Sequence, residues 1–396
     1  MPPVWTVDAA VRYALENNPE LAAVRQQHGI AAAGVVIAQT YPFNPIWEGK
    51  IRATTGPESA GITNAVSNEH KFLVDVEIRG QRKYRRQGAD AALSRVDWEI
   101  AFQEVNLANR VVRAFYAVVY RNEKLALVAE IIQLNEKAAE HVRKLVDQAR
   151  LKPADLVLIG TEVDDARGQE GPAQTSLAMA GYDLRRALGL IRQDLTVQGK
   201  LQAPPFPEDH ETLVNKALEL RPDLHARQAA VQEAEARLQL EIRNRYGNPN
   251  IGPAYEYDPT RVNLIGAQIT LPLPLFNTHR GEIMQRSAER GKAGLELHQT
   301  EVQVRQDVEA ALARLEKARA WANNYEKQII PNFRSSLERI ERLFDLDPTV
   351  DVLRIIEIRR KLLKARDTYL DALWEVTLAQ ADLAAALGDP SIIISH

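Results

Sequence analysis

The chain repeats itself at a distance of about 200 residues. The stretch Ala14-Leu15-Glu16-Asn17-Asn18-Pro19-Glu20-Leu21 returns as Ala217-Leu218-Glu219-Leu220-Arg221-Pro222-Asp223-Leu224, and both halves end in Ala-Leu-Gly, at 187–189 and at 386–388. Each copy runs through a helix, an Asn-Pro, alternating strand-like stretches, a basic turn and a very long helical tract. Self-similarity of this kind predicts an elongated tube built from two similar halves rather than an enzyme.

The repeat sets the predicted domain organisation. The first repeat covers 1–197, with a β-hairpin at 44–80 and long helices at 82–190. A linker at 198–209 contains Pro204-Pro205-Phe206-Pro207. The second repeat covers 210–396, with a β-hairpin at 248–272 and long helices at 281–388.

Composition supports long helices and excludes several functions. Aromatic residues make up only 6% and charged residues 26%, which is typical of Ala/Leu-rich helices in coiled-coil-like contact. A net charge of −3 gives no case for nucleic-acid binding. The chain has no cysteine, and its eight histidines are scattered without metal-ligand spacing. We therefore expect no cofactor, no metal site and no catalytic residues.

Long helices are predicted over five tracts, at 7–40, 82–150, 155–188, 281–345 and 351–387. The first ends before Pro42 and Pro45, because proline cannot continue the helical hydrogen bonding. The tract from 82 to 150 alone spans roughly 100 Å at 1.5 Å per residue. No apolar stretch is long enough for a transmembrane helix, and Met1–Trp5 does not resemble a signal peptide. Either the protein is not exported or its leader was removed, and the predicted strands favour the second.

Four stretches alternate between apolar and polar residues and predict strands, at 47–53, 71–79, 251–258 and 265–271. Four strands cannot close a barrel, and open edges are not tolerated in hydrocarbon, but three chains together would supply twelve strands. A soluble sandwich is the alternative for the strands alone, and the attached long helices favour the membrane. The polar residues predicted to line the barrel lumen are Glu48, Lys50, Arg52, Asp75, Glu77, Arg79 and Glu256.

Several motifs resemble the outer membrane factor family, the TolC-like exit ducts of Gram-negative efflux and type I secretion systems. They include the opening Ala-Leu-Glu and Asn-Pro-Glu-Leu with their copy at 217–224. The stretch Leu271-Pro272-Leu273-Pro274-Leu275-Phe276-Asn277, followed by Arg280-Gly281-Glu282-Ile283, resembles the family's strand-to-helix junction. The equivalent junction is Glu77-Ile78-Arg79-Gly80-Gln81-Arg82-Lys83, whose basic form is most similar to the CzcC/CusC-like branch that serves heavy-metal exporters.

The resemblance implies a mainly α fold with a small β part. It implies a homotrimer with a 12-stranded β-barrel in outer membrane lipid and a 12-helix α-barrel in the periplasm. The localisation would be the Gram-negative outer membrane, extending into the periplasm. The duct would be passive, joined by a periplasmic adaptor protein to an inner-membrane RND-type pump, with heavy-metal cations as cargo. The same duct serving drug efflux or type I protein secretion is the alternative, followed by a soluble helical scaffold.

The turns between the long helices carry the remaining predicted sites. The resemblance makes them the periplasmic tip, where the adaptor would contact Lys152, Pro153, Asp155, Asp347 and Pro348. Thr349 to Leu353 matches the family's gate segment, so Asp351 would line the closed aperture, although Asp351 and Asp155 also suit helix capping. Where the TolC pattern has a second aspartate this chain has Arg354, so Asp351–Arg354 pairs between protomers are expected to hold the gate shut.

Overall fold

The protein, seen as a computed structural model, is described over residues 4–57, 65–201, 209–346 and 352–389. Its chain forms two compact units, each built from both repeats. Unit 1 comprises Met1–Val24, Ala101–Arg221 and Val302–His396, and unit 2 comprises Arg25–Ile100 and Pro222–Glu301. Unit 2 contains all four strands of the larger sheet, and unit 1 contains the largest buried core.

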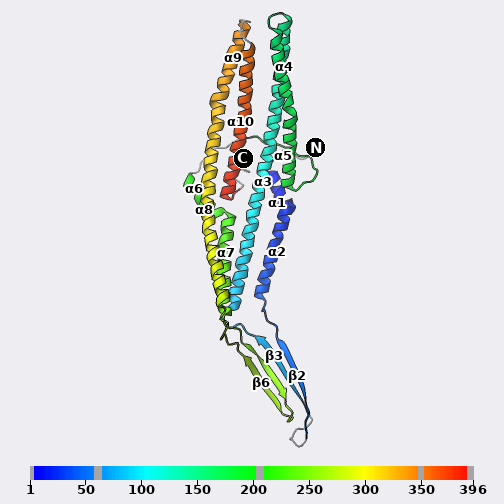
Figure 1. Ribbon diagram of the computed structural model, residues 1–396, viewed down its shortest axis with the longest axis vertical. Coiled ribbons are helices and arrows are strands. Elements are labelled where there is room, and N and C mark those ends of the chain that lie inside the picture. Colours follow the sequence, from blue (N-terminus) through cyan, green and yellow to red (C-terminus); the bar gives the residue numbers. More distant parts are fainter. Residues whose placement is uncertain (1–3, 58–64, 202–208, 347–351, 390–396) are drawn as a thin grey trace. The chain divides into compact units, whose positions relative to one another are not determined.

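The order of elements repeats, as Figure 1 shows by its labels. The first series is α1 (Val7–Asn17), α2 (Pro19–Gln39), β2 (Ile46–Thr54), β3 (Ala65–Asp75), α3 (Gln81–Asp147), α4 (Pro153–Gly168) and α5 (Glu170–Leu188). The second is α6 (His210–Leu220), α7 (Pro222–Asn244), β5 (Asn250–Tyr257), β6 (Asn263–Thr270), α8 (Arg280–Asn324), the π-helical turn η2 (Tyr325–Ile329), α9 (Ile330–Leu346) and α10 (Val352–Leu387). The predicted fold class, a duplicated and mainly helical chain with a small sheet part, is confirmed.

Three predicted helices are broken where the sequence analysis had them continuous. The tract 7–40 divides at Asn18, whose side-chain oxygen accepts hydrogen bonds from the backbone N–H groups of Glu20 (2.9 Å) and Leu21 (3.2 Å). Asn18 thus caps a new helix that Pro19 begins. The tract 155–188 divides at Gln169 between α4 and α5.

The third break is the π-helical turn. Pro331 lacks the N–H that would bond the carbonyl four residues earlier, and its ring would clash with that carbonyl. The wider turn relieves this clash, with the backbone N–H of Ile330 bonding the carbonyl of Tyr325, five residues back. The tract 281–345 is therefore α8, η2 and α9 in succession.

The repeated Ala-Leu-Gly has a common physical role. Gly189 (φ 76°) and Gly388 (φ 72°) lie in the left-handed region that favours glycine, and each ends a helix. In the first repeat the side chain of Asn18 donates a hydrogen bond to the carbonyl of Ala187 at 2.9 Å. The Asn-Pro and the Ala-Leu-Gly of this repeat therefore meet in one junction of unit 1. A Cβ on Gly189 would lie 2.8 Å from Pro19, so the contact also requires glycine.

The larger sheet is antiparallel, with strand order β2-β3-β5-β6. Its central pair, β3 with β5, joins the two repeats, and β2 and β6 are its edges. A Cβ added to Gly252 of β5 would lie 1.7 Å from the carbonyl oxygen of Phe72 in β3, so this pair needs glycine there. A second, two-stranded parallel sheet pairs β1 (Val4–Trp5) with β4 (Thr196–Val197).

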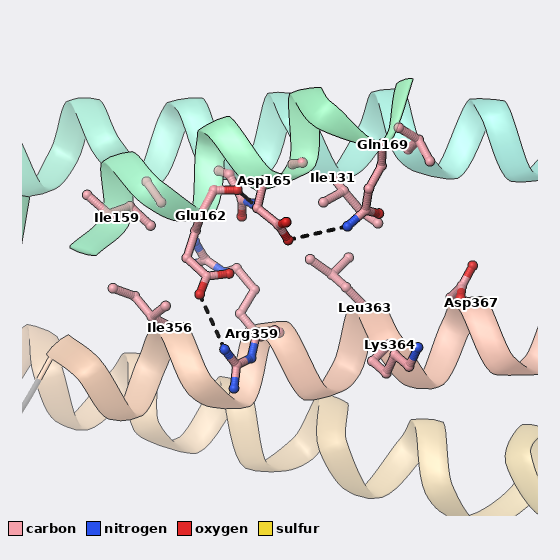
Figure 2. A pocket seen from close by; sticks show the side chains of 15 residues that line it. Ile131, Ile159, Glu162, Asp165, Gln169, Ile356, Arg359, Leu363, Lys364 and Asp367 are labelled. Atoms are coloured by element: carbon pink, nitrogen blue, oxygen red, sulfur yellow. Dashed lines mark hydrogen bonds and ion pairs between the residues drawn. The ribbon is translucent and has the colours of Figure 1, made fainter. Parts of the chain in front are cut away.

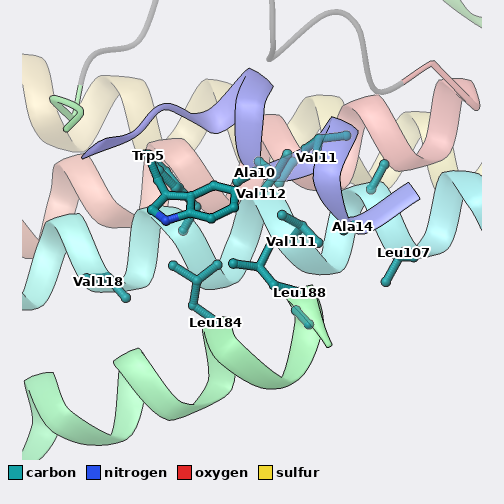
Figure 3. Close-up of a cluster of buried hydrophobic side chains, with 14 of the residues drawn as sticks. Trp5, Ala10, Val11, Ala14, Leu107, Val111, Val112, Val118, Leu184 and Leu188 are labelled. Atoms are coloured by element: carbon teal, nitrogen blue, oxygen red, sulfur yellow. The ribbon is translucent and has the colours of Figure 1, made fainter. Parts of the chain in front are cut away.

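Unit 1 is held by an aliphatic core along α1, α3 and α5 (Figure 3). Phe115 and Val111 of α3 meet Leu184 and Leu188 of α5, and all four are almost fully buried. A second cluster runs along α8 and α10, with Val304, Val308, Leu315, Val376 and Leu383 buried. Small and aliphatic side chains predominate in both clusters, although Trp5, Phe115 and Tyr120 belong to the first.

Candidate functional site

The four-stranded sheet of unit 2 has two chemically different faces. The register pairs Trp47 with Phe72, Ile51 with Asn68, and Glu48 with Lys71. Because neighbouring residues on a strand point to opposite sides, the even-numbered positions of β2 share the polar face and the odd-numbered ones the apolar face. Four of the predicted lumen residues, Glu48, Lys50, Arg52 and Glu256, therefore lie on one face of these strands, with Asp75 at the last position of β3.

Charges on the polar face are paired across strands. Glu69 of β3 forms ion pairs with Lys50 of β2 (3.6 Å) and with Lys71 of its own strand. Glu69 also lies opposite Glu256 of β5, and the two lysines offset this like-charge contact. At the end of β3, the carboxylate of Asp75 accepts a hydrogen bond from Asn250 at 3.1 Å. The face is hydrophilic and mixed in sign, as expected of a surface in contact with water.

The opposite face presents large apolar side chains to the outside of the chain. Their exposed fractions are 60% for Trp47, 77% for Ile51, 85% for Ile265 and 64% for Ile269. Three rings stack across three strands, with Trp47 and Tyr255 on either side of His70 at centroid distances of 5.8 and 6.3 Å. A contiguous exposed apolar face marks an interaction surface for lipid or protein.

The strand predicted over 71–79 is displaced in the structure, where β3 covers 65–75. Glu77 and Arg79 follow the strand and tie the sheet to the helices instead. Glu77 forms an ion pair with Arg85 of α3. Arg79 donates hydrogen bonds to the backbone carbonyls of Tyr246 (2.6 Å) and Gly247 (3.1 Å). Glu77 and Arg79 therefore lie outside the strand, at the junction between the sheet and the helices.

Sequence reasoning missed Glu69 as part of the polar face, and it placed Lys71 on that face without naming it among the lumen residues. The displaced strand explains the omission, since Glu69 lies before the predicted start. The alternation does extend back through Val66, Ser67 and Glu69, but Asn68 and His70 interrupt its apolar side. The pairings with β2 and with β5 both place Asn68 and His70 on the apolar face.

The turn between α3 and α4 contains three of the predicted adaptor contacts. Lys152 and Pro153 are exposed, and Asp155 is partly buried. The carboxylate of Asp155 accepts a hydrogen bond from the backbone N–H of Lys152 at 3.1 Å, which confirms the capping role predicted for it. Asp347, Pro348 and Asp351 lie outside the described residues. Arg354 is exposed in the first turn of α10.

A polar network joins α3 to α10 within unit 1. Tyr120 donates a hydrogen bond to Asp371 at 2.5 Å, and Lys124 pairs with Asp371 at 2.8 Å. Burial and the hydrogen bond to Asp371 raise the pKa of Tyr120, so the phenol stays protonated and remains a donor. Arg366 of α10 donates two hydrogen bonds, of 2.6 and 2.8 Å, to the carboxylate of Glu130 in α3. These bonds lower the pKa of the Glu130 carboxyl.

A pocket of about 170 Å³ lies between α3, α4 and α10 in unit 1 (Figure 2). Its floor is apolar, with Ile131, Ile159 and Leu363, and its rim is charged. The rim charges are partly paired, since Arg360 lies 3.3 Å from Glu162. The lining contains no serine, cysteine or histidine, and therefore none of the usual nucleophile–base pairs.

Among the described residues, no helix is long and apolar enough to cross a membrane. Within the same residues, no three acidic or histidine side chains are grouped so as to hold a metal ion.

Residues 213–389, almost the whole second repeat, match the sequence profile of the family described as outer membrane efflux protein. Through its second repeat the chain resembles the outer membrane efflux protein family. This match, together with the fold, indicates an outer membrane efflux channel of Gram-negative cells that extends into the periplasm, a conduit rather than an enzyme. No curated protein matches the chain by sequence.

Solved structures share the fold of this chain over nearly its full length. CusC is 15% identical, with a TM-score of 0.78 over 97% of this chain and 92% of that one. The open-state outer membrane channel MtrE of Neisseria gonorrhoeae is 18% identical, with a TM-score of 0.75 over 97% and 89%. The outer membrane protein VceC of Vibrio cholerae is 14% identical, with a TM-score of 0.74 over 97% and 96%. The TolC-like fold that the sequence predicts is therefore shown.

Proposed function

We propose that three copies of this chain form the passive exit duct of a tripartite efflux system. A periplasmic adaptor would join the duct to an inner-membrane RND-type pump, which supplies the energy. One observation carries the proposal: the four-stranded sheet has a charged face, an exposed apolar face and two unpaired edges.

The edges determine how such a sheet can exist in a bilayer. Unpaired backbone N–H and C=O groups along β2 and β6 would each cost several kcal/mol in hydrocarbon. Pairing β2 of one copy with β6 of the next satisfies both edges at once, and three copies close a 12-stranded barrel. The apolar face then contacts lipid. The charged face, with Glu48, Lys50, Arg52 and Glu256, lines a water-filled lumen, into which Asp75 and Glu77 also project, whereas Arg79 lies at the junction with the helices.

Cross-linking of the two edges tests this assembly. Because the chain has no native cysteine, only the introduced cysteines can react. Ala53→Cys on β2 and Ala267→Cys on β6 lie on the same face, and a short bifunctional maleimide in detergent should convert the double variant into covalent trimers. The single variant Ala267→Cys should give no species larger than a dimer. Exclusive recovery of monomers from the double variant would contradict the proposal.

Heavy-metal cations are the proposed cargo. The support is the basic Gly80-Gln81-Arg82-Lys83 junction, which resembles the heavy-metal branch of the family. The polar face is mixed in sign and does not select a cargo by itself, so drug efflux and type I protein secretion are the competing assignments. Expression in a strain that lacks its own duct, together with the cognate pump and adaptor, should restore growth on zinc or copper. Restored growth on drugs alone would favour the second assignment.

The periplasmic end is proposed to close through Asp351 and Arg354, and the adaptor to contact Lys152, Pro153, Asp155, Asp347 and Pro348. Threefold symmetry would bring three copies of each gate residue together, and Asp351–Arg354 pairs between protomers would hold the aperture shut. The double variant Asp351→Ala/Arg354→Ala should raise single-channel conductance in planar bilayers severalfold. The matched control is Glu357→Ala/Lys361→Ala, which removes an ion pair of 2.7 Å from the same helix. Equal conductance of the two variants, with unchanged block by divalent cations, would refute the gate.

A further inference from the structure

The junction between the sheet and the helices of unit 2 concentrates positive charge. Three segments, 76–86, 241–249 and 272–283, contain eight lysine and arginine residues against three acidic ones. All three segments lie at the same end of the sheet, because β3 and β6 end there and β5 begins there. Two of the acidic side chains are already engaged, since Glu77 pairs with Arg85 and Glu241 with His279 at 3.0 Å.

Two tyrosine rings organise this charge into clusters. The ring of Tyr84 has Lys83 and Arg243 within 5.6 and 5.5 Å of its centroid, and the ring of Tyr246 has Arg79 and Arg245 within 5.0 and 5.6 Å. We call these six residues the cationic collar. Within the described residues, Lys83, Arg243 and Arg245 are exposed and have no carboxylate partner at ion-pairing distance. Each ring thus has two like charges within 5.6 Å of its centroid, an arrangement that a bound anion would stabilise.

An exposed apolar segment lies directly beside the collar. Between β6 and α8, the exposed fractions are 59% for Leu271, 73% for Leu273, 75% for Leu275 and 100% for Phe276. The segment packs on the backbone next to Tyr246 of the collar, since a Cβ added to Gly247 would lie 2.4 Å from Pro272. Apolar side chains, tyrosines and cations therefore meet in one band at the end of the sheet.

This combination matches the chemistry of a membrane–water interface. Tyrosine concentrates at the level of the lipid headgroups, and basic side chains near a membrane surface attract anionic lipids. The planar guanidinium also suits the geometry of phosphate oxygens. We propose that the cationic collar binds the phosphate groups of anionic phospholipids in the leaflet next to the helices, while Leu271 to Phe276 insert among the acyl chains. The inference rests on the proposed function, in which the sheet spans the bilayer.

The test compares the full-length protein with a triple variant, Lys83→Gln/Arg243→Gln/Arg245→Gln. Purified protein in dodecyl maltoside is titrated with phosphatidylglycerol or with phosphatidylcholine, and bound lipid is measured by phosphorus assay after gel filtration. The wild-type protein should retain phosphatidylglycerol in preference to phosphatidylcholine, and the preference should fall as salt rises. Since each basic residue near a surface contributes about 1 kcal/mol, the triple variant should bind phosphatidylglycerol at least about tenfold more weakly.

Two further variants serve as controls. Lys137→Gln/Arg143→Gln/Arg192→Gln removes the same charge from exposed positions of unit 1 and should leave lipid retention unchanged. Lys83→Arg/Arg243→Lys/Arg245→Lys keeps the charge of the collar and should retain phosphatidylglycerol to within about threefold of wild type, because the attraction depends mainly on charge. The charge-conserving variant also preserves the test if the glutamine variant does not fold.

Three results would overturn the collar assignment. One is equal phosphatidylglycerol retention by the collar and unit 1 triple variants. Another is unchanged lipid retention together with altered anion-to-cation permeability in planar bilayers, which would place the collar in the lumen. The third is retention that salt does not weaken. Failure of the wild-type protein to insert and conduct is a separate result, since it would refute the proposed function itself.

Discussion

Trp5 and Trp47 are the same kind of side chain in opposite surroundings. In unit 1, Trp5 belongs to the core cluster and is 8% exposed, whereas Trp47 on the sheet of unit 2 is 60% exposed. Their neighbours differ in the same way. The core of unit 1 consists of side chains that pack on one another, whereas the sheet pairs its backbone groups and leaves its apolar side chains exposed. Unit 1 is therefore stabilised by side-chain packing within the chain, and the sheet by backbone pairing and by whatever covers its apolar face.

The largest effect is expected at Gly252. Because the sheet is stabilised by backbone pairing, it should be most sensitive at a position where two strands approach too closely for any Cβ. In Gly252→Ala the new methyl group would lie 1.7 Å from the Phe72 carbonyl oxygen, so β3 and β5 must separate. The cost should exceed the roughly 1–3 kcal/mol typical of overpacking. Urea unfolding in detergent, followed by circular dichroism, measures it.

Gly266→Ala provides the matched control, since nothing lies within 4 Å of a Cβ added at Gly266 on the neighbouring strand. It should change the free energy of unfolding by less than about 1 kcal/mol. Equal destabilisation by the two alanines would show that the central strand pair is not closely packed, against the structure.

A lysine introduced on either face of β6 tests whether the two faces of the sheet have different surroundings. Ile265→Lys puts a cation on the apolar face, where lipid contact makes it cost up to about 2–4 kcal/mol of folding into vesicles. Gln268→Lys adds the same charge to the polar face and should cost much less. Urea titration in phosphatidylcholine vesicles compares the two. If both substitutions cost the same, the apolar face does not contact hydrocarbon.

The smallest expected effect concerns a half-buried carboxyl in unit 1. Burial raises the pKa of Glu123, against the opposing effect of a hydrogen bond from the backbone of Leu201. A raised pKa means that the folded state favours the protonated acid. The associated stability is complete below the pKa of the unfolded chain and is lost as the pH rises through the folded value.

Glu123→Gln mimics the protonated acid and should therefore stabilise unit 1 at neutral pH but not at acidic pH. Because the side chain is partly solvated, the gain should stay under about 1 kcal/mol. Thermal unfolding between pH 4 and pH 8 gives the comparison with wild type. A variant that is less stable than wild type at neutral pH would show that the carboxylate is stabilising instead.

The sequence predicted what local patterns control. The duplication, four strands and the long tract of α3 all follow from periodicity and from the spacing of prolines. The break at Asn18 also had a local signal, since Asn-Pro is a helix cap followed by a proline at the first helical position. That signal was outweighed by the continuous helical pattern around it. The role of Gly189 became clear only with its positive φ and its contact with Pro19.

Pairings between the repeats could not be predicted from one sequence. Glu69 lies opposite Glu256 because β3 pairs with β5, and Tyr84 meets Arg243 because α3 begins where α7 ends. Neither contact leaves a mark in local sequence, since each depends on how two distant segments meet. The predicted gate illustrates another limit, because Asp351 was assigned by resemblance and its role awaits the conductance experiment.

The two edges of the sheet are different strands, β2 and β6, so a ring of three copies must close head to tail. Every subunit then contributes to two of the three junctions, and a single copy with a damaged edge leaves the ring open. In a cell that makes normal and edge-damaged subunits in equal amounts, only about one ring in eight would contain three sound copies. Damage to an edge strand should therefore behave as a dominant trait, whereas loss of the gene should behave as a recessive one.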